Sequence, residues 1–407
     1  MPQSKNETNA AALVAGVPRV SPDTVSPAEP ESKRLLLLKF GAIGDVIMAI
    51  PAAALMHAAG YAIDWVASET VAPILRLYPW IHVITVNEVS LLRGSGPQRL
   101  RHMAALWQEL REQQARHGEY DLCATLYYDR RYRLLTLPVR ARQRISLSWQ
   151  DRATRLLPGR HHTDEYARIL SGRPDAETPT QLAPIAAPNL PACNRPKVPD
   201  RPRIVLVPAG ARNLLRDDAL RRWAVEHYVA VAEALLARGY EIVLAGGPED
   251  RWASAHFAAF AATAGPTSFA DLIGTLSLVA TLALLDSADV TLTHDTGPLH
   301  LAGITSTAIV TIFGPTDPHG RLPQRANCIA LWGGEGFACR PCYDGREYAP
   351  CPHNGCMDQV TPAMVLQEVE SLLQARREHR ALPPSVKVPT RGSLIQLAPA
   401  AEARGGA

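Results

Sequence analysis

Short apolar runs that end in a glycine-rich turn and lead into a helix-like segment recur in both halves of this sequence. Runs of this kind, apolar throughout, are typical of strands buried on both faces of a parallel sheet. In the first half the pattern predicts strands at 34–39, 61–67, 83–86 and 122–127, with helices at 45–59 and 99–117. In the second half it predicts strands at 203–208, 241–245, 290–293 and 308–313, with helices at 223–238, 277–285 and 298–303. Alternating strands and helices indicate doubly wound α/β domains.

The length of 407 residues favours two such domains over one. Six prolines between 183 and 203 mark a plausible hinge between the halves. Open α/β sheets bind ligands at the carboxyl ends of their strands, so two facing domains predict a shared cleft. The predicted organisation is a disordered leader at 1–32, a Rossmann-like domain at 33–185, a linker at 186–202, a Rossmann-like domain at 203–380 and a flexible tail at 381–407.

Charge is concentrated in one stretch of the chain. The net charge of +3 does not predict nucleic-acid binding, but nine arginines lie between 130 and 160 against one acid, Asp151. These arginines are either a solvated surface or a cradle for an anionic partner, such as a phosphorylated glycolipid or membrane headgroups. Residues 1–32 do not read as a signal peptide, and Pro51 interrupts the longest uncharged stretch. We therefore expect a cytoplasmic protein with, at most, peripheral membrane contact.

The turn Lys39-Phe-Gly-Ala-Ile-Gly-Asp45 is the first candidate for chemistry. Its glycines allow a sharp turn and a close approach of the backbone to a ligand. Asp45 has two interpretations: it caps the helix that follows, or it is a general base that takes a proton from an acceptor hydroxyl. A dinucleotide-binding turn is disfavoured because the Gly-x-Gly-x-x-Gly pattern is absent.

Three turns in the second half are candidates for binding a nucleotide. His294-Asp-Thr-Gly-Pro298 follows a strand and opens a helix whose free amide groups favour a phosphate, although an ordinary strand-to-helix turn has the same pattern. The loop at 208–213, with Arg221 and Arg222 after it, suits a diphosphate or is a solvated surface. The turn at 246–250 offers a carboxylate to ribose hydroxyls or is a solvated turn.

Four of the seven cysteines, Cys339, Cys342, Cys351 and Cys356, fall within 18 residues. Because cytosolic disulfides are uncommon, clustered thiols indicate a metal site, with zinc as the simplest occupant. Reduced structural thiols and a redox role are the alternatives.

Two stretches of this chain resemble those of a known family. The opening Leu35-Leu-Leu-Leu-Lys-Phe-Gly-Ala-Ile-Gly-Asp-Val-Ile-Met-Ala-Ile-Pro51 is similar to that of glycosyltransferase family 9, the ADP-heptose:lipopolysaccharide heptosyltransferases. Asp64-Trp65-Val66 and Leu75-x3-Pro79 also match. In the second half, His294-Asp-Thr-Gly-Pro-x-His-Leu-Ala302 and Phe313-Gly-Pro-Thr-Asp-Pro318 resemble the family's most diagnostic segment. The resemblance covers about 33–373.

The resemblance implies an inverting transferase of the GT-B fold that moves a heptose from ADP-heptose to a lipopolysaccharide core. It implies that Asp45 is the base, and that the turn at 295–297 binds the donor diphosphate without a divalent metal. An arginine, Arg221, stands where the family often has a lysine two residues before Trp223. The residues predicted to bind the donor are Gly210, Arg221, Arg222, Glu249, Asp295, Thr296 and Gly297. Those predicted to bind an anionic glycolipid acceptor are Lys39, Gly44, Arg130, Arg131 and Arg133.

Two other functions stay open on the sequence. One is transfer of a sugar from another nucleotide sugar, for capsule or protein glycosylation. The other is a non-catalytic module that binds a nucleotide sugar or a metal.

Overall fold

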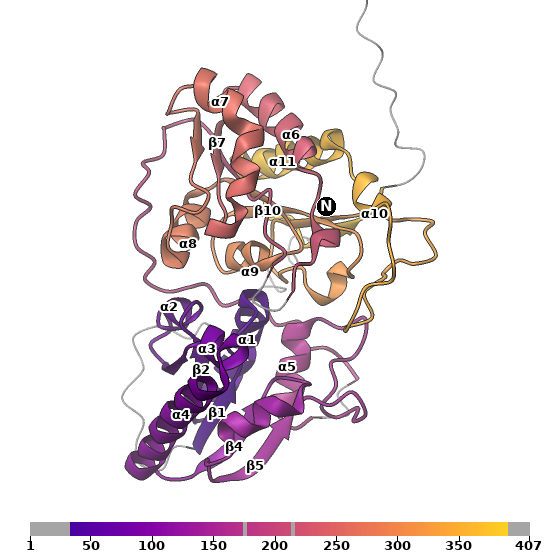
Figure 1. The fold of residues 1–407 in the computed structure, drawn as a ribbon. Coiled ribbons are helices and arrows are strands. Elements are labelled where there is room, and N and C mark those ends of the chain that lie inside the picture. The colour runs from indigo at the N-terminus through magenta and orange to yellow at the C-terminus, as the bar shows by residue number, and fades with distance from the viewer. Residues whose placement is uncertain (1–32, 174–176, 213–215, 390–407) are drawn as a thin grey trace, which may run out of the picture.

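The computed structural model describes residues 33–173, 177–212 and 216–389, which form two stacked α/β halves (Figure 1). Each half is built on a parallel sheet. The predicted leader, 1–32, lies outside the described residues.

The first sheet has the strand order β3-β2-β1-β4-β5. Its strands are β1 (Lys33–Leu38), β2 (Tyr61–Ser68), β3 (Ile81–Val86), β4 (Tyr120–Thr125) and β5 (Ala141–Ser146). The helical segments of this half are α1 (Ile43–Ala58), α2 (Ala72–Leu75), α3 (Glu88–Arg93), α4 (Gly96–His117), η2 (Arg130–Thr136) and α5 (His162–Leu170). β1 is apolar from residue 35 to its end because, as predicted, both of its faces are buried. Leu35 and Leu37 pack into one buried cluster, and Leu36 and Leu38 pack into another on the opposite face.

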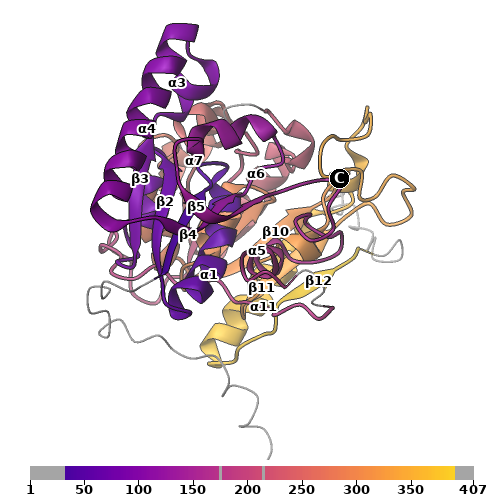
Figure 2. The ribbon, with the colours of Figure 1, turned by 90° about the horizontal axis from the view of Figure 1, so that it is seen from below.

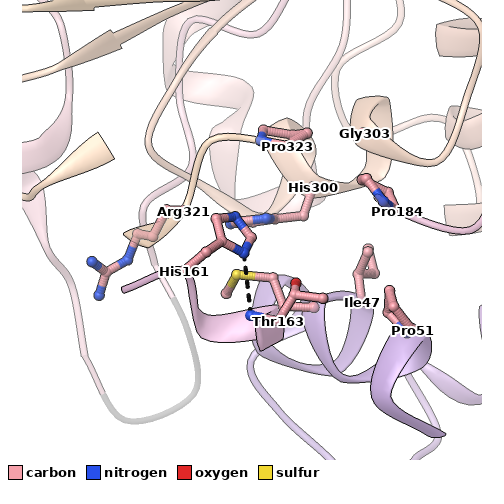
Figure 3. A pocket seen from close by; sticks show the side chains of 10 residues that line it. Ile47, Pro51, His161, Thr163, Pro184, His300, Gly303, Arg321 and Pro323 are labelled. Carbon is pink, nitrogen blue, oxygen red and sulfur yellow. Dashed lines mark hydrogen bonds between the residues drawn. The ribbon is translucent and has the colours of Figure 1, made fainter. Parts of the chain in front are cut away.

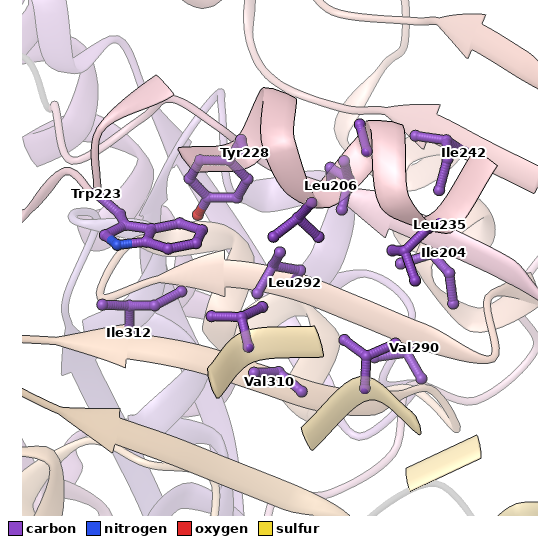
Figure 4. Packing of buried hydrophobic residues seen from close by; sticks show 14 of the residues in the cluster. Ile204, Leu206, Trp223, Tyr228, Leu235, Ile242, Val290, Leu292, Val310 and Ile312 are labelled. Carbon is purple, nitrogen blue, oxygen red and sulfur yellow. The ribbon is translucent and has the colours of Figure 1, made fainter. Parts of the chain in front are cut away.

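The second sheet has the strand order β12-β11-β10-β9-β6-β7-β8. Its strands are β6 (Arg203–Leu206), β7 (Glu241–Leu244), β8 (Phe269–Asp271), β9 (Val290–His294), β10 (Ala308–Phe313), β11 (Cys328–Trp332) and β12 (Ser385–Lys387). The helical segments are η3 (Ala219–Arg221), α6 (Val225–Ala237), η4 (Pro248–Phe257), α7 (Ala258–Thr263), α8 (Leu278–Ser287), α9 (Gly297–Gly303), η5 (Pro318–Gly320), α10 (Gly355–Asp358) and α11 (Pro362–Arg377). Trp223 and Tyr228 pack over Leu206 and Leu292 in the core of this half (Figure 4).

Several elements differ from the sequence prediction. β5, α5, β8 and β11 were not predicted, and the sheet does not end at β10. Part of the flexible tail predicted at 381–407 is ordered instead, because Ser385–Lys387 forms β12 and pairs with β11. Residues from 390 onward lie outside the described part of the chain. Both sheets are doubly wound as predicted, which gives the α/β fold class expected for GT-B.

The two halves meet through α1 and α9, which lie next to each other at the boundary (Figure 1). Ile47 of α1 belongs to an apolar cluster that consists mostly of residues from the second half, including Leu299 and Leu301 of α9. The chain between the halves has little regular structure, and its Ala187 amide donates to the Ile304 carbonyl at 3.1 Å. In the view from below, α1 and α5 lie on the viewer's side of the strands of the second sheet (Figure 2). The carboxyl ends of β1 and β9 therefore open toward this boundary.

Candidate active site

The turn after β1 is fixed by a lysine and a tyrosine. Lys39 is buried, its Nζ lies 3.0 Å from Asp45 Oδ2, and it lies over the Tyr127 ring at 4.4 Å. The Tyr127 hydroxyl accepts hydrogen bonds from the amides of Phe40 and Gly41 and donates to the Gly41 carbonyl at 2.9 Å. These contacts satisfy the backbone of the tight turn, so its shape is set before any ligand binds.

The structure contradicts the interpretation of Asp45 as a helix cap. Helix α1 begins at Ile43, its N-cap is Ala42, and no side chain caps it. The Asp45 side chain instead pairs with Lys39 and is 37% exposed. Burial raises the pKa of Asp45, but the charges of Lys39 and Arg321 help to hold that pKa below its usual value. Asp45 is therefore an ionised, accessible carboxylate at neutral pH.

Residues from both halves surround Asp45. A methyl group on Gly44 would lie 2.4 Å from His300 Cδ2, so His300 of α9 packs directly on the turn at 39–45. His300 also lines a cavity of about 10 Å³ between α1, α5 and Arg321, with room for no more than one water (Figure 3). Burial lowers the pKa of His300 to about 4 and that of His162 to about 3. Both imidazoles are neutral at pH 7.

Asp295, in the second half of the protein, holds a second group of charged side chains. It follows β9, is buried, and lies 3.3 Å from Arg221 and 4.0 Å from Arg321. Thr316 donates to the same carboxylate oxygen at 2.7 Å. Burial raises the pKa of Asp295, but Arg221 and Arg321 outweigh it and lower the pKa to about 2. The Asp295 carboxylate therefore positions two arginines.

Arg221 keeps one bonding group unused. Its guanidinium pairs with Asp218 at 2.9 Å and with Asp295. Its buried Nε has no hydrogen-bond partner within the described part of the chain. An unsatisfied charged donor is costly in a buried place, and an anionic ligand would satisfy it.

The loop at 208–213 is held against the turn at 295–297. Gly210 has a φ of +101°, and a methyl group there would lie 2.7 Å from Thr296 Oγ1, so this position requires glycine. The Ala211 amide donates to Thr296 Oγ1 at 2.8 Å. Arg222 Nε donates to the Gly210 carbonyl at 2.8 Å, and the guanidinium also pairs with Asp217. Arg222 is thus engaged in holding this loop.

The turn at 246–250 points one carboxylate inward and another outward. Asp250 accepts hydrogen bonds from the Gly210 amide at 3.0 Å and the Gly247 amide at 2.8 Å. Glu249 is 79% exposed and lies 3.6 Å from Arg212. Gly297 opens α9 and contacts Ile43 of α1 across the boundary. The predicted donor residues thus form one wall, with Glu249 at its edge.

The predicted acceptor arginines lie on the surface of η2. Arg130, Arg131 and Arg133 are exposed, and Arg131 pairs with Asp129. Tyr132 of the same segment stacks on Tyr127 with ring centroids 3.9 Å apart, so η2 lies beside the turn at 39–45 that Tyr127 holds. The remaining arginines of the run do not form one cradle. Arg142 pairs with Asp121, and Arg160 pairs with the buried Glu165.

Glu88 is a second carboxyl group at the turn that sequence reasoning missed. A methyl group on Gly41 would lie 2.9 Å from Glu88 Oε1, so the Glu88 carboxyl group packs against this turn. Burial raises the pKa of Glu88 to about 7, against the opposing effect of Lys39. Two carboxyl groups with opposite pKa shifts therefore flank one lysine.

The four clustered cysteines are free thiols. Cys339, Cys342 and Cys351 lie on one loop, and Cys356 lies in α10. Among the residues that the structure describes, no three histidine, cysteine or acidic side chains converge as a metal-ligand set. Burial and the neighbouring thiols of Cys339 and Cys351 raise the pKa of Cys342. The cysteines are thus neighbours, but their sulfurs do not surround a common point.

Sequence reasoning also missed His162, His300 and Arg321 as site residues. Arg321 follows the Phe313–Pro318 segment closely, and that segment was the available signal for it. His162 and His300 reach Asp45 only through the packing of α5 and α9 on α1, for which the sequence carries no local signal.

Comparisons with known proteins are consistent with this architecture. Residues 103–349 match the sequence model of "Glycosyltransferase family 9 (heptosyltransferase)". The chain is 32% identical to lipopolysaccharide heptosyltransferase 3 of Escherichia coli over 153 residues, 37% of this chain and 43% of that protein. It is 24% identical to lipopolysaccharide heptosyltransferase 1 of Pseudomonas aeruginosa over 374 residues, 84% of this chain and 98% of that protein. The first of these matches spans less than half of the relative's length.

Solved structures share the fold. The ADP-heptose lipopolysaccharide heptosyltransferase II of E. coli superposes with a TM-score of 0.64 at 19% identity, over 84% of this chain and 99% of that chain. The iron-containing dodecameric glycosyltransferase TibC of enterotoxigenic E. coli superposes with a TM-score of 0.52 at 16% identity, over 85% of this chain and 77% of that chain. Across residues 33–173, 177–212 and 216–389, no helix has the length and apolar character needed to span a bilayer.

Proposed function

Since this chain belongs to glycosyltransferase family 9, with a family match over more than half of its length, we propose that it transfers a heptose from ADP-heptose to a lipopolysaccharide core with inversion at the anomeric carbon. One observation carries the proposal. An ionised, accessible carboxylate, Asp45, faces a wall in which Asp295 positions Arg221 and Arg321. A base opposite a cationic wall is the arrangement that a displacement of a diphosphate needs.

Asp45 acts as the general base in this proposal. It takes the proton from the acceptor hydroxyl while that oxygen attacks the anomeric carbon and the bond to the diphosphate breaks. Lys39 keeps Asp45 ionised and orients it through their 3.0 Å contact. The neutral imidazoles of His162 and His300 exclude water from the rear of the carboxylate without adding positive charge.

The leaving ADP is stabilised by protein cations, and the proposal requires no divalent metal for catalysis. Arg221 offers its unsatisfied Nε to a diphosphate oxygen, and Arg321 supplies a second positive charge. Gly210 and Thr296 bring the backbone close to the nucleotide. Glu249, exposed at the edge of this wall, binds the ribose.

The acceptor is an anionic glycolipid that docks on η2, and the protein works at the cytoplasmic surface of the inner membrane. In a 3₁₀ helix the side chains repeat every three residues, so Leu134 and Leu137 share one face. They are 52% and 62% exposed, beside Arg130 and Arg133, which form no ion pair with any described residue. Exposed leucines next to unpaired arginines match an anionic lipid surface.

A structural zinc at the four cysteines stays a hypothesis. Thiolates suit zinc, but the described sulfurs do not converge, so no step of the reaction is assigned to a metal. Metal analysis of purified protein tests it. About one zinc per chain would support the site, and a metal-free protein with full activity would reject it.

The decisive experiment compares Asp45→Asn with the wild-type protein. We expect kcat for transfer from ADP-heptose to fall about 10²–10⁴-fold while ADP binding persists, because the variant keeps the shape of the side chain but cannot accept the proton. Asp200→Asn, at an exposed linker position, is the matched control. Unchanged transfer by Asp45→Asn would refute the base assignment. A donor panel that finds transfer only from another nucleotide sugar would replace the donor, and no transfer from any donor would favour a binding module.

A further inference from the structure

A hairpin within the cysteine-rich loop crosses the boundary between the halves. Tyr343 and Tyr348 form an antiparallel bridge with ring centroids 4.8 Å apart. The Asp344 amide donates to the Glu347 carbonyl at 3.2 Å, and the Ala349 amide donates to the Cys342 carbonyl at 3.1 Å. We call residues 343–348 the tyrosine hairpin. Its backbone bonds make it an ordered element.

The tip of the tyrosine hairpin rests on the first half. A methyl group on Gly345 would lie 3.2 Å from the Trp149 ring, and the Arg346 guanidinium lies over that ring at 4.3 Å. Trp149 in turn stacks on Tyr128 with centroids 3.8 Å apart. Tyr128 lies just beyond the carboxyl end of β4, next to Tyr127, whose hydroxyl holds the turn at 39–45. Cation–π and stacking contacts therefore tie the tip to the acceptor side.

The base of the tyrosine hairpin rests on the second half. The Tyr343 amide donates to the Pro315 carbonyl at 3.1 Å. The Arg321 guanidinium lies 5.6 Å from the Tyr343 ring and 4.0 Å from Asp295. The loop that carries the hairpin descends from the second half toward the first (Figure 1). The hairpin thus contacts both halves, at Trp149 of the first and at Arg321, beside Asp295, of the second.

Both tyrosines lie beside charged residues of the site. Arg321 and Asp45 are among the charges that act on Tyr343, Arg221 and Asp295 are among those that act on Tyr348, and Asp218 acts on both. Burial raises the pKa of each phenol, so both keep their protons at neutral pH. In a displacement, the transferred sugar lies between the leaving diphosphate and the base. Since Arg321 contacts both the Tyr343 ring and Asp295, the tyrosine pair lies at the diphosphate end of that interval.

We propose that Tyr343 and Tyr348 form a binding subsite for the ring of the transferred sugar, held in place by the clasp of Arg346 on Trp149. This proposal rests on the proposed function and deepens it. Aromatic faces suit the C–H edges of a pyranose, and half-buried tyrosines bring both a ring and a hydroxyl. The Tyr348 hydroxyl keeps its proton because burial raises its pKa, so it can donate to a sugar oxygen. The Tyr343 hydroxyl donates to the Gly345 carbonyl at 3.0 Å, so this residue offers mainly its ring.

The subsite is tested by comparing the binding of ADP with that of ADP-heptose in the full-length chain. We expect Tyr343→Ala and Tyr348→Ala each to weaken ADP-heptose binding roughly 10-fold and to leave ADP binding unchanged. Tyr343→Phe keeps the ring and should bind like the wild type, whereas Tyr348→Phe should lose part of the affinity with its hydroxyl. Arg346→Ala should also weaken ADP-heptose binding, but by less than Tyr343→Ala or Tyr348→Ala, since it removes only the contact of Arg346 with Trp149 that holds the hairpin.

Phe337→Ala is the matched control, because Phe337 is an exposed aromatic residue of the same loop outside the tyrosine hairpin. Thermal melting of every variant shows whether the fold persists. If Tyr343→Ala and Tyr348→Ala both keep the wild-type melting temperature and the wild-type affinity for ADP-heptose, the subsite is refuted. If the alanine variants lose ADP and ADP-heptose binding equally, the hairpin supports the nucleotide wall and the sugar subsite is also refuted. A wild-type protein that binds neither ligand and transfers no sugar would instead refute the proposed function.

Discussion

Gly44→Ala places a methyl group where the second half of the protein already touches the first. The new Cβ would lie 2.4 Å from His300 Cδ2 and 2.9 Å from His300 Nε2. Since carbon atoms pack at about 3.5–4.0 Å, His300 or α1 must move by about 1 Å or more. His300 is buried in α9, so its ring has little room to yield. Overpacking of this kind costs about 1–3 kcal/mol.

The strain acts next to Asp45, so we expect activity to fall as well as stability. A displacement of about 1 Å at a reacting group lowers kcat/KM by up to about 100-fold. The melting temperature should fall by about 3–8 °C for a domain of this size. Thermal melting and steady-state transfer kinetics measure the two effects on the same samples.

The double variant Gly44→Ala/His300→Ala makes the test specific. Removing the imidazole opens the space that the methyl group needs, so the two substitutions should be non-additive by about 1–2 kcal/mol. Gly96→Ala is the matched control, because a methyl group there meets no atom within 4 Å. Wild-type melting and kinetics in Gly44→Ala, or strict additivity with His300→Ala, would refute the reasoning.

Three further predictions concern charge and the cysteine-rich loop. The pKa of Glu88 is about 7 in the folded protein, above its unfolded value, so its stabilising effect is present at low pH and is lost as the pH rises toward 7. The melting temperature of Glu88→Gln should therefore match that of the wild type at pH 5 and exceed it at pH 8. Equal melting temperatures of the two proteins at both pH values would contradict this. The pKa of Asp295 is about 2, below its unfolded value, so about 2–3 kcal/mol of stability is present above pH 4 and is lost as the pH falls toward 2; in melts from pH 6 to 3, Asp295→Asn should be less stable at pH 6 and should lack part of the acid-dependent decline. The double variant Cys342→Ser/Cys351→Ser changes thiols on either side of the tyrosine hairpin and should weaken ADP-heptose binding more than ADP binding in calorimetry. Equal losses of affinity for the two ligands would count against a link between these thiols and the hairpin.

The sequence predicted the central strands well because their physical signal is local. β1 is apolar at every internal position, and its turn carries glycines and Asp45, so both the strand and the site residue could be recognised. β5 was missed because it is an edge strand whose arginines, including Arg142 and Arg144, stay largely exposed. A single buried face gives no continuous apolar run.

The rest of the site could not be predicted because it forms only when the halves pack together. His300 contacts the turn at 39–45 from α9, and the Asp295 carboxylate brings together Arg221 and Arg321 from separate segments. Each pair is far apart in the sequence, and nothing local to either residue signals the contact. Glu88 likewise reaches Gly41 from the start of α3, where it reads as an ordinary first-turn acid of a helix.

The contact surface between the halves limits how family members can be recombined. The His161 imidazole donates to the Leu322 carbonyl at 3.0 Å, and Gln324 donates to Asp164 at 3.0 Å, so the start of α5 is fitted to one particular segment of the other half. A chimaera that joins the first half of this chain to the second half of a relative must carry matching partners at these positions and leave space at residue 44. Without them, the hybrid would contain two intact sheets and a misaligned reaction centre. Only exchanges that respect this boundary should therefore yield working hybrids.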